Sequence, residues 1–232
     1  HCESSAASDV YKRQVFQLST FPMDHPDTFR TASQLREIIT DLGWRKIVAF
    51  QTRNPMHRAH EEVCRIACER INADGLIIHM LLGKLKEGDI PAKTRDECIR
   101  TMVASYFHDL PVLISGYGFD MLYAGPREAL LHAIVRQNLG ATHLIIGRDH
   151  AGIGNFYGEF EAQEIFDEWH DVSELQIKIF KADHAAYSKK LEKVVMLNEV
   201  DNHKAVDFVT LSGTKLRELL ANGQLPPAEV VR

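Results

Sequence analysis

Hydrophobic residues in this chain fall into short, nearly continuous runs, separated by longer segments in which they recur every three or four positions. A run such as residues 75–82 (GLIIHMLL) is apolar almost throughout, which is typical of a strand buried on both faces of a parallel sheet. The intervening segments have the periodicity of amphipathic helices. This alternation predicts an α/β fold in which helices cover both faces of a parallel sheet.

Capping residues, glycines and prolines set the expected boundaries of these elements. Thr31 or Ser33 is suited to cap the first helix and Gly43 to end it, while Pro91 and Pro126 suit the first turns of later helices. We expect helices over residues 31–42, 57–72, 91–107, 126–138, 161–169 and 212–222, and strands over residues 46–50, 75–82, 111–115, 143–146, 176–180 and 194–197.

The two ends of the chain depart from this pattern. Residues 1–15 are small, polar and aperiodic and lack the apolar centre of a signal peptide. We interpret them as a disordered leader or a cloning-derived tail. The main core is expected over residues 31–170, and residues 171–232 are expected to be the C-terminal part of the catalytic region, truncated soon after a helix.

Composition and charge limit the classes of partner. The 232 residues are 45% hydrophobic and 25% charged, with a formal net charge of −5. This balance favours neither nucleic acid nor a membrane as a partner, and the apolar runs are too short to cross a bilayer. Any anion must therefore be held by a local cluster of donors. Cys2, Cys64, Cys68 and Cys98 lack the spacing of a zinc site, so we interpret them as free thiols of a cytoplasmic protein.

The first polar segment with chemical potential is residues 51–60 (QTRNPMHRAH), directly after the strand expected at residues 46–50. His57 and His60 are three positions apart, on one face of a first helical turn whose backbone N–H groups attract phosphate. Arg53 adds a permanent planar charge suited to a tetrahedral oxyanion. A purely structural alternative is a turn followed by helix-capping histidines. The combination at the carboxyl end of a strand favours a binding site.

A second segment, residues 147–154 (GRDHAGIG), follows the strand expected at residues 143–146. Its glycines allow the backbone to approach a ligand closely. Arg148 and His150 supply hydrogen-bond donors, and Asp149 can orient one of them or a ribose hydroxyl. A simple turn is the alternative. Because the segment follows a buried strand, as the first one does, we expect the two to meet at one edge of the sheet.

A third segment, residues 211–217 (LSGTKLR), opens the last expected helix. Ser212 or Thr214 is suited to cap that helix, which by itself explains the pattern. The functional alternative is that the same N–H groups, with Lys215 or Arg217, hold the β- and γ-phosphates of a nucleotide.

These motifs, in this order, resemble the HIGH-type nucleotidyltransferase superfamily, and QTRNPMHRAH with GRDHAG is similar in particular to the ATP sulfurylase (sulfate adenylyltransferase) family. Residues 88–91 (GDIP), 125–128 (GPRE) and 211–220 are similar too, so the resemblance extends from about residue 21 to the end. It implies a Rossmann-like (HUP-type) nucleotidyltransferase core with a parallel sheet and a small C-terminal α/β portion. It also implies that residues 16–30 are the exit of a missing N-terminal PUA-like domain.

The resemblance further implies that ATP and sulfate are converted to adenylyl sulfate and diphosphate, or the reverse, by direct in-line attack on the α-phosphorus. Mg²⁺ would arrive with the ATP, and family members usually assemble into homo-oligomers. The implied catalytic residues are Thr52, Arg53, Asn54, His57 and His60; the implied ATP-binding residues are Gln51, Thr52, Arg53, Asn54, Gly147, Arg148, Asp149, His150 and Val195; and sulfate would be bound by Gln51, Arg53 and the backbone N–H of Ala151.

Two departures from family patterns narrow these expectations. Some bacterial and archaeal members carry a cysteine-rich zinc site, but residues 184–192 read HAAYSKKLE, with serine and leucine in place of the first cysteines, so no zinc is expected. The chain also lacks a P-loop, so it holds no fused adenylylsulfate kinase module. The alternatives are an adenylyltransferase for another acceptor, such as phosphorylated pantetheine or nicotinate nucleotide, and a non-catalytic nucleotide-binding fragment.

Overall fold

Five parallel strands form the central sheet of the computed structural model, which describes residues 20–84, 89–168, 175–210 and 213–231. The strand order is β3-β2-β1-β4-β5, so the chain moves outward from β1 on one side and then returns to add β4 and β5 on the other. This is a Rossmann-like α/β fold, as the sequence predicts. The strands are β1 (Ile47–Thr52), β2 (Gly75–Leu81), β3 (Val112–Tyr117), β4 (His143–Ile146) and β5 (Lys178–Lys181).

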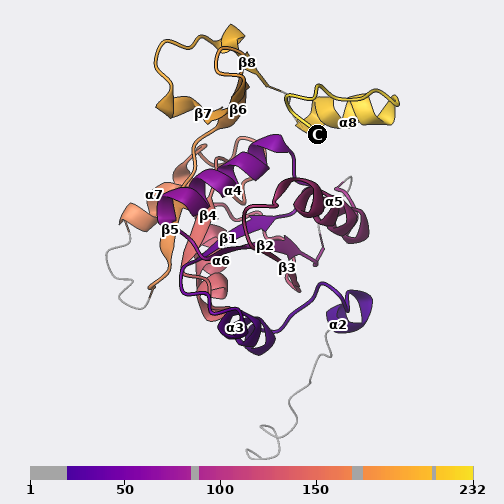
Figure 1. Ribbon diagram of the computed structural model, residues 1–232, viewed down its shortest axis with the longest axis vertical. Helices are drawn as coiled ribbons and strands as arrows, with labels where there is room; N and C mark the ends of the chain where they lie inside the picture. The colour runs from indigo at the N-terminus through magenta and orange to yellow at the C-terminus, as the bar shows by residue number, and fades with distance from the viewer. Residues whose placement is uncertain (1–19, 85–88, 169–174, 211–212, 232) are drawn as a thin grey trace, which may run out of the picture.

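Helices cover both faces of this sheet (Figure 1). Alternate residues of β1 serve the two layers: Val48 packs in one apolar cluster with Cys64 of α4, and Ala49 packs in the other with Ala133 of α6. Strands buried on both faces need apolar residues at every position, which explains the continuous runs in the sequence. One face carries α4 (Arg58–Ile71) and α5 (Ala92–Tyr106), and the other carries α3 (Ala32–Asp41), α6 (Pro126–Asn138) and α7 (Glu161–Glu168).

The C-terminal part adds a small antiparallel sheet and a helix at one end of the core (Figure 1). The sheet has the order β7-β6-β8, with β6 paired to both neighbours. Because β5 pairs with β4, the central sheet extends past residue 170, where the sequence predicts a domain boundary. The elements are β6 (Ala185–Ser188), β7 (Lys193–Met196), the 3₁₀ helices η1 (Leu197–Glu199) and η2 (Ala205–Asp207), β8 (Phe208–Val209) and α8 (Gly213–Ala221).

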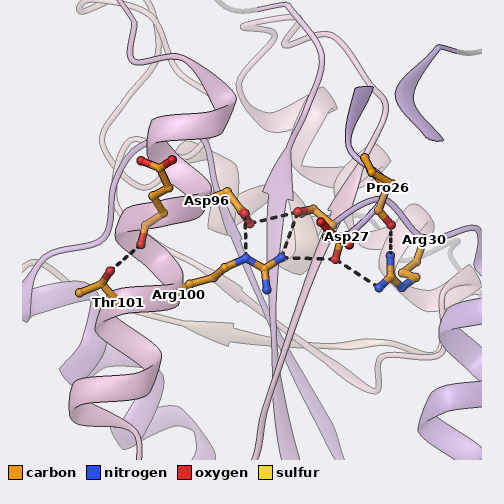
Figure 2. Close-up of polar contacts among 8 residues, drawn as sticks. Pro26, Asp27, Arg30, Asp96, Arg100 and Thr101 are labelled. Carbon is orange, nitrogen blue, oxygen red and sulfur yellow. Dashed lines mark hydrogen bonds and ion pairs between the residues drawn. The ribbon is translucent and has the colours of Figure 1, made fainter. Parts of the chain in front are cut away.

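The N-terminal segment is attached to the core through β3 and α5. After α2 (Phe21–Asp24), the carbonyl of Thr28 accepts a hydrogen bond from the backbone N–H of Gly116 at 2.8 Å. Figure 2 shows Arg100 of α5 donating to the carbonyl of Asp27 (3.3 Å) and to the carboxylate of Asp96 (2.8 Å). This segment therefore folds with the core. The predicted leader at residues 1–15 and the first residues of the predicted 16–30 segment lie outside the described residues.

The helices and strands expected from the sequence are present, with ends shifted by at most a few residues. Helix α6 and strand β4 have the predicted bounds. The elements absent from the prediction are α2, the two 3₁₀ helices and the short strands β6 and β8. Within the described ranges, no helix combines the length and the apolar character needed to cross a bilayer.

Candidate functional site

The two polar segments predicted to meet do lie side by side, because β1 and β4 are adjacent parallel strands. A pocket of about 600 Å³ opens between them at the carboxyl ends of these strands. His57 and His60 from the first segment line it, together with Gly147, Arg148 and Asp149 from the second. The change of direction in strand order between β1 and β4 is where ligands bind in sheets of this type.

The outer wall of this pocket comes from the C-terminal part of the chain. His184 and Tyr187 line it, and so does Glu229. The backbone N–H of Arg58 donates to the carbonyl of Val230 at 3.2 Å, which holds the final described residues against the start of α4. Of the two described valines at this point of β7, Val194 lines the pocket and Val195, the residue implied by the family resemblance, does not.

The two histidines form a close pair at the N-terminus of α4. Their ring centroids are 3.9 Å apart, and the backbone N–H of His57 donates to Nδ1 of His60 at 3.3 Å. Burial lowers the pKa of His57 to about 4; burial and then the proximity of His57 lower the pKa of His60 well below its ordinary value. Both rings are therefore neutral near pH 7. Because Nδ1 of His60 accepts, its proton is on Nε2, so the pair offers N–H donors rather than fixed charge.

Thr52 and Asn54 shape the turn that leads from β1 toward this pair. The hydroxyl of Thr52 donates to the carbonyl of Asn54 at 2.7 Å and accepts from its backbone N–H at 3.1 Å. Thr52 is only 5% exposed, whereas Asn54 is exposed. The Thr52 hydroxyl thus uses its proton and one lone pair to close a tight local turn, and its contribution is to the shape of the loop.

Arg53 is not among the described residues that line the pocket, and its side chain belongs to a compact polar group. Its guanidinium lies 3.7 Å from a carboxylate oxygen of Asp89 and 4.9 Å from the ring centroid of Tyr123. The Tyr123 hydroxyl in turn donates to Asp89 at 3.2 Å. The fully buried Arg95 fixes the neighbouring backbone through hydrogen bonds to the carbonyls of Leu81 (2.7 Å) and Ile90 (3.0 Å). Sequence reasoning did not find Asp89, Tyr123 or Arg95, although the GDIP resemblance points to the segment that contains Asp89.

The Gly-Arg-Asp-His turn is held in a strained backbone conformation. Asp149 and Ala151 have φ values of +53° and +56°, in the left-handed region that non-glycine residues adopt rarely. The backbone N–H of Asp149 donates to the carbonyl of Glu159 at 2.8 Å, and Nη2 of Arg148 donates to the Glu159 carboxylate at 2.6 Å. The carbonyl of Ala151 accepts from the N–H of Gly125 at 3.0 Å. These bonds fix the backbone that faces the pocket.

Gln51 and His150 face α6 rather than the pocket, and neither is among the described residues that line it. Both contact His132, a residue of α6 that the sequence does not single out. Burial, with further contributions from His132, Arg136 and Arg53, lowers the pKa of His150 well below its ordinary value. Arg53 is close enough to His150 to affect its pKa, and Gln51 and His150 share His132 as a partner. Gln51, Arg53 and His150 therefore belong to one polar region beside the pocket.

The third predicted motif lies farther out. Leu211 and Ser212 are outside the described residues, and Lys215 forms an ion pair with Glu218 on an exposed face of α8 at 3.2 Å. Leu216 lines a second, more apolar cavity of about 690 Å³, which also touches the histidine pair. Among the described residues, no three His, Cys, Asp or Glu side chains converge as a metal site.

Comparison with known proteins identifies the family. The ATP-sulfurylase family model matches residues 26–232. A sulfate adenylyltransferase from Alcanivorax borkumensis is 62% identical over 219 residues, and one from Allochromatium vinosum is 60% identical over the same length; each alignment covers 94% of this chain and 55% of the relative. The chain thus spans about half the length of these relatives.

A solved structure supports the fold assignment. A hexameric APS kinase from Thiobacillus denitrificans superposes with a TM-score of 0.68 at 22% identity, over 90% of this chain and 38% of that one. At this identity the likeness concerns the fold alone. Because the family model covers almost all of the described residues and relatives share three-fifths of the aligned positions, the chain belongs to the ATP-sulfurylase family.

Proposed function

We propose that the protein containing this chain is a sulfate adenylyltransferase, which converts ATP and sulfate to adenylyl sulfate and diphosphate, or runs the reverse reaction. The observation that carries the proposal is the pocket shared by the histidine pair and the Gly-Arg-Asp turn, at the strand-order reversal of a Rossmann-like sheet. The two relatives whose alignments cover 94% of this chain are themselves named sulfate adenylyltransferase, which supports the proposal.

The proposed reaction is a direct displacement at phosphorus. A sulfate oxygen forms a bond to the α-phosphorus of ATP, and the bond from that phosphorus to the bridging oxygen breaks, so that diphosphate leaves with the electron pair. Sulfate is a dianion at neutral pH and needs no general base. The protein must instead bring two anions together and stabilise the charge of a five-coordinate phosphorus, which is a task for positioning and electrostatics.

We assign the pocket to ATP and the neighbouring polar region to sulfate. Gly147, Arg148 and Asp149, which line the pocket, would hold the adenosine part of ATP. The other residues that the family resemblance implies would act by shaping the loops and the strand around the pocket; they are His150, Thr52, Asn54 and Val195. Gln51, Arg53 and the backbone N–H of Ala151 would hold sulfate. His57 and His60, which are neutral in the free protein, would act as N–H donors to phosphate oxygens in the transition state. Mg²⁺ enters this scheme as part of the substrate, bound to the ATP phosphates.

The proposal is tested by exchange of labelled diphosphate into ATP, with the chain and the full-length protein assayed side by side. Exchange should require sulfate, and molybdate, a tetrahedral analogue, should cause release of AMP and diphosphate. Exchange with a phosphopantetheine or nicotinate nucleotide acceptor, and not with sulfate, would instead support the alternative adenylyltransferase. Tight ATP binding, measured by calorimetry, without turnover of any acceptor by the full-length protein would establish a non-catalytic module.

A cytoplasmic location and homo-oligomeric assembly are part of the same proposal. The location is favoured by the free thiols of Cys64 and Cys68, which are buried side chains on one face of α4. Light scattering of the full-length protein measures the assembly state, and fractionation of cells measures the location.

A further inference from the structure

A single buried residue of α6 contacts both substrate loops. His132 is 3% exposed. Its Nδ1 lies 3.0 Å from Nε2 of His150, in the loop after β4, and its Nε2 lies 3.3 Å from the side-chain amide of Gln51, at the end of β1. The same Nε2 is 3.4 Å from a carboxylate oxygen of Glu128, one turn earlier on α6. The two loops of the proposed site are therefore joined beneath the pocket through one imidazole.

The position of each proton in this group follows from Glu128. Burial would raise the pKa of this carboxyl, but hydrogen bonds from His132 and from the backbone N–H groups of Leu122 (2.9 Å) and Ala124 (3.0 Å) hold it below its ordinary value. Glu128 is therefore a carboxylate near pH 7. Burial lowers the pKa of His132 to about 4, so its ring is neutral and has one N–H. That N–H is on Nε2, because a carboxylate only accepts.

This tautomer fixes the partner on the other side of the ring. With its proton on Nε2, His132 presents a lone pair at Nδ1, so His150 must donate from its own Nε2. The remaining nitrogen of His150, Nδ1, then has no proton and is an acceptor. This arrangement gives His150 one orientation and one tautomer.

The Gln51 amide is oriented by the same proton. Its Oε1 is buried and has no hydrogen-bond partner among the described residues, while its Nε2 faces the Nε2 of His132. Because amide oxygen and nitrogen positions are assigned rather than observed, turning the amide by 180° lets Oε1 accept from His132. The –NH₂ group of Gln51 is then left as a donor, the group that a sulfate oxygen requires.

We propose that His132 is a positioning residue, held by Glu128, which sets the Gln51 amide as a donor for sulfate and fixes the His150 ring in the ATP-binding loop. This inference rests on the proposed function. His132 is not assigned a contact with either substrate. Its effect on the reaction passes through Gln51 on the sulfate side and through His150 on the ATP side.

Two substitutions separate the halves of this role. In His132→Asn, the shorter side chain keeps an acceptor at the former Nδ1 and loses the donor at Nε2, so the KM for sulfate should rise while the KM for ATP stays near the wild-type value. In His132→Gln, the longer side chain keeps a donor near the former Nε2 and loses the acceptor at Nδ1, so the opposite pattern is expected. Losing one such hydrogen bond should raise the affected KM about 5- to 10-fold.

The matched control is His143→Asn. His143 begins β4, at the opposite end of that strand from the loop that contains His150, and its Nδ1 lies 2.9 Å from the hydroxyl oxygen of Thr142. Its replacement removes an imidazole that is remote from Gln51 and His132, so it should lower thermal stability and leave the ratio of the two KM values unchanged. Circular dichroism confirms the fold of each variant before kinetics.

Nitrogen-detected NMR of the histidine rings in the wild-type protein provides the second readout. His132 and His150 should both be Nε2–H tautomers, and His150 should lose that single tautomer in His132→Gln. Folded variants that shift both KM values equally, or neither, would overturn the positioning role, as would an Nδ1–H tautomer at His132. If the wild-type protein shows no sulfate-dependent exchange, the proposed function fails, and the NMR result still decides the His132 geometry.

Discussion

Acidification from pH 7 to pH 5 should destabilise this fold markedly, because it protonates histidines in the unfolded chain that the folded protein keeps neutral. The clearest case is His132, whose pKa is lowered from 6.5 to about 4, mainly by burial. Between these two values the unfolded state binds a proton that the folded state does not. The free energy of unfolding therefore falls as the pH falls through this window.

The magnitude follows from the two pKa values. For a single group that titrates at 6.5 when unfolded and at about 4 when folded, moving from pH 7 to pH 5 costs about 2 kcal/mol. Burial also lowers the pKa of His57 to about 4 and those of His60, His79 and His150 well below the ordinary value. The combined loss should be a large fraction of the 5–15 kcal/mol that typically stabilises a domain.

Urea unfolding at pH 5, 6 and 7, followed by circular dichroism, measures this effect. The variant His132→Gln cannot gain the proton, so between pH 7 and pH 5 it should lose about 2 kcal/mol less than the wild type. Tyr117→Phe is the control, since it changes a buried polar side chain near His132 without removing a histidine. It should keep the wild-type pH dependence. Equal losses in His132→Gln and the wild type would refute the reasoning.

Three further changes test the site and the fold. Arg53→Ala should fold but lose about 10²- to 10³-fold in sulfate-dependent exchange, and Arg53→Lys, which keeps charge without the planar fork, should recover only part; full exchange in the alanine variant would contradict the assignment. Gly75→Ala would place a Cβ 2.4 Å from the Trp44 ring. Urea titrations should therefore show a free energy of unfolding lower by about 1–3 kcal/mol, and adding Trp44→Leu should restore part of this loss. ATP binding at pH 6 should take up a proton, because the phosphates raise the pKa of His57. Calorimetry in two buffers of different ionisation enthalpy detects this uptake. If the uptake persists in His57→Asn, another group binds the proton.

The central sheet was predictable because burial on both faces leaves a strong signal. Strands β1 to β5 and the helices between them were expected within a few residues of their bounds, and the strand-end rule correctly placed the two loops together. Strands β6 and β8 were missed for a physical reason. Strand β6 has four residues and strand β8 has two, so neither contains enough positions to show the alternation of buried and exposed side chains that is typical of a strand.

The interior of the site was less predictable than its outline. His132 and Tyr123 reach Gln51 and Arg53 only because α6 and the segment before it pack against the carboxyl end of the sheet, some 70 to 80 positions away in sequence. No spacing rule connects such residues. The β7 strand shows a second limit: neighbouring side chains of a strand face opposite sides, so a one-residue difference in alignment decides whether Val194 or Val195 faces the pocket.

In this chain of net charge −5, the two arginines assigned to the substrates each have a carboxylate partner in the free protein. Arg53 is paired with Asp89 and Arg148 with Glu159, while the histidine pair is neutral. The side chain of Asp89 is buried, so it offsets part of the cost of desolvating Arg53, whereas Arg148 and Glu159 are more exposed and their ion pair contributes little to stability. Under the proposed function, sulfate would have to compete with Asp89 for Arg53, and ATP with Glu159 for Arg148. Binding would then exchange one carboxylate partner for one oxyanion, so selectivity depends on the tetrahedral fit of the ligand rather than on surplus positive charge.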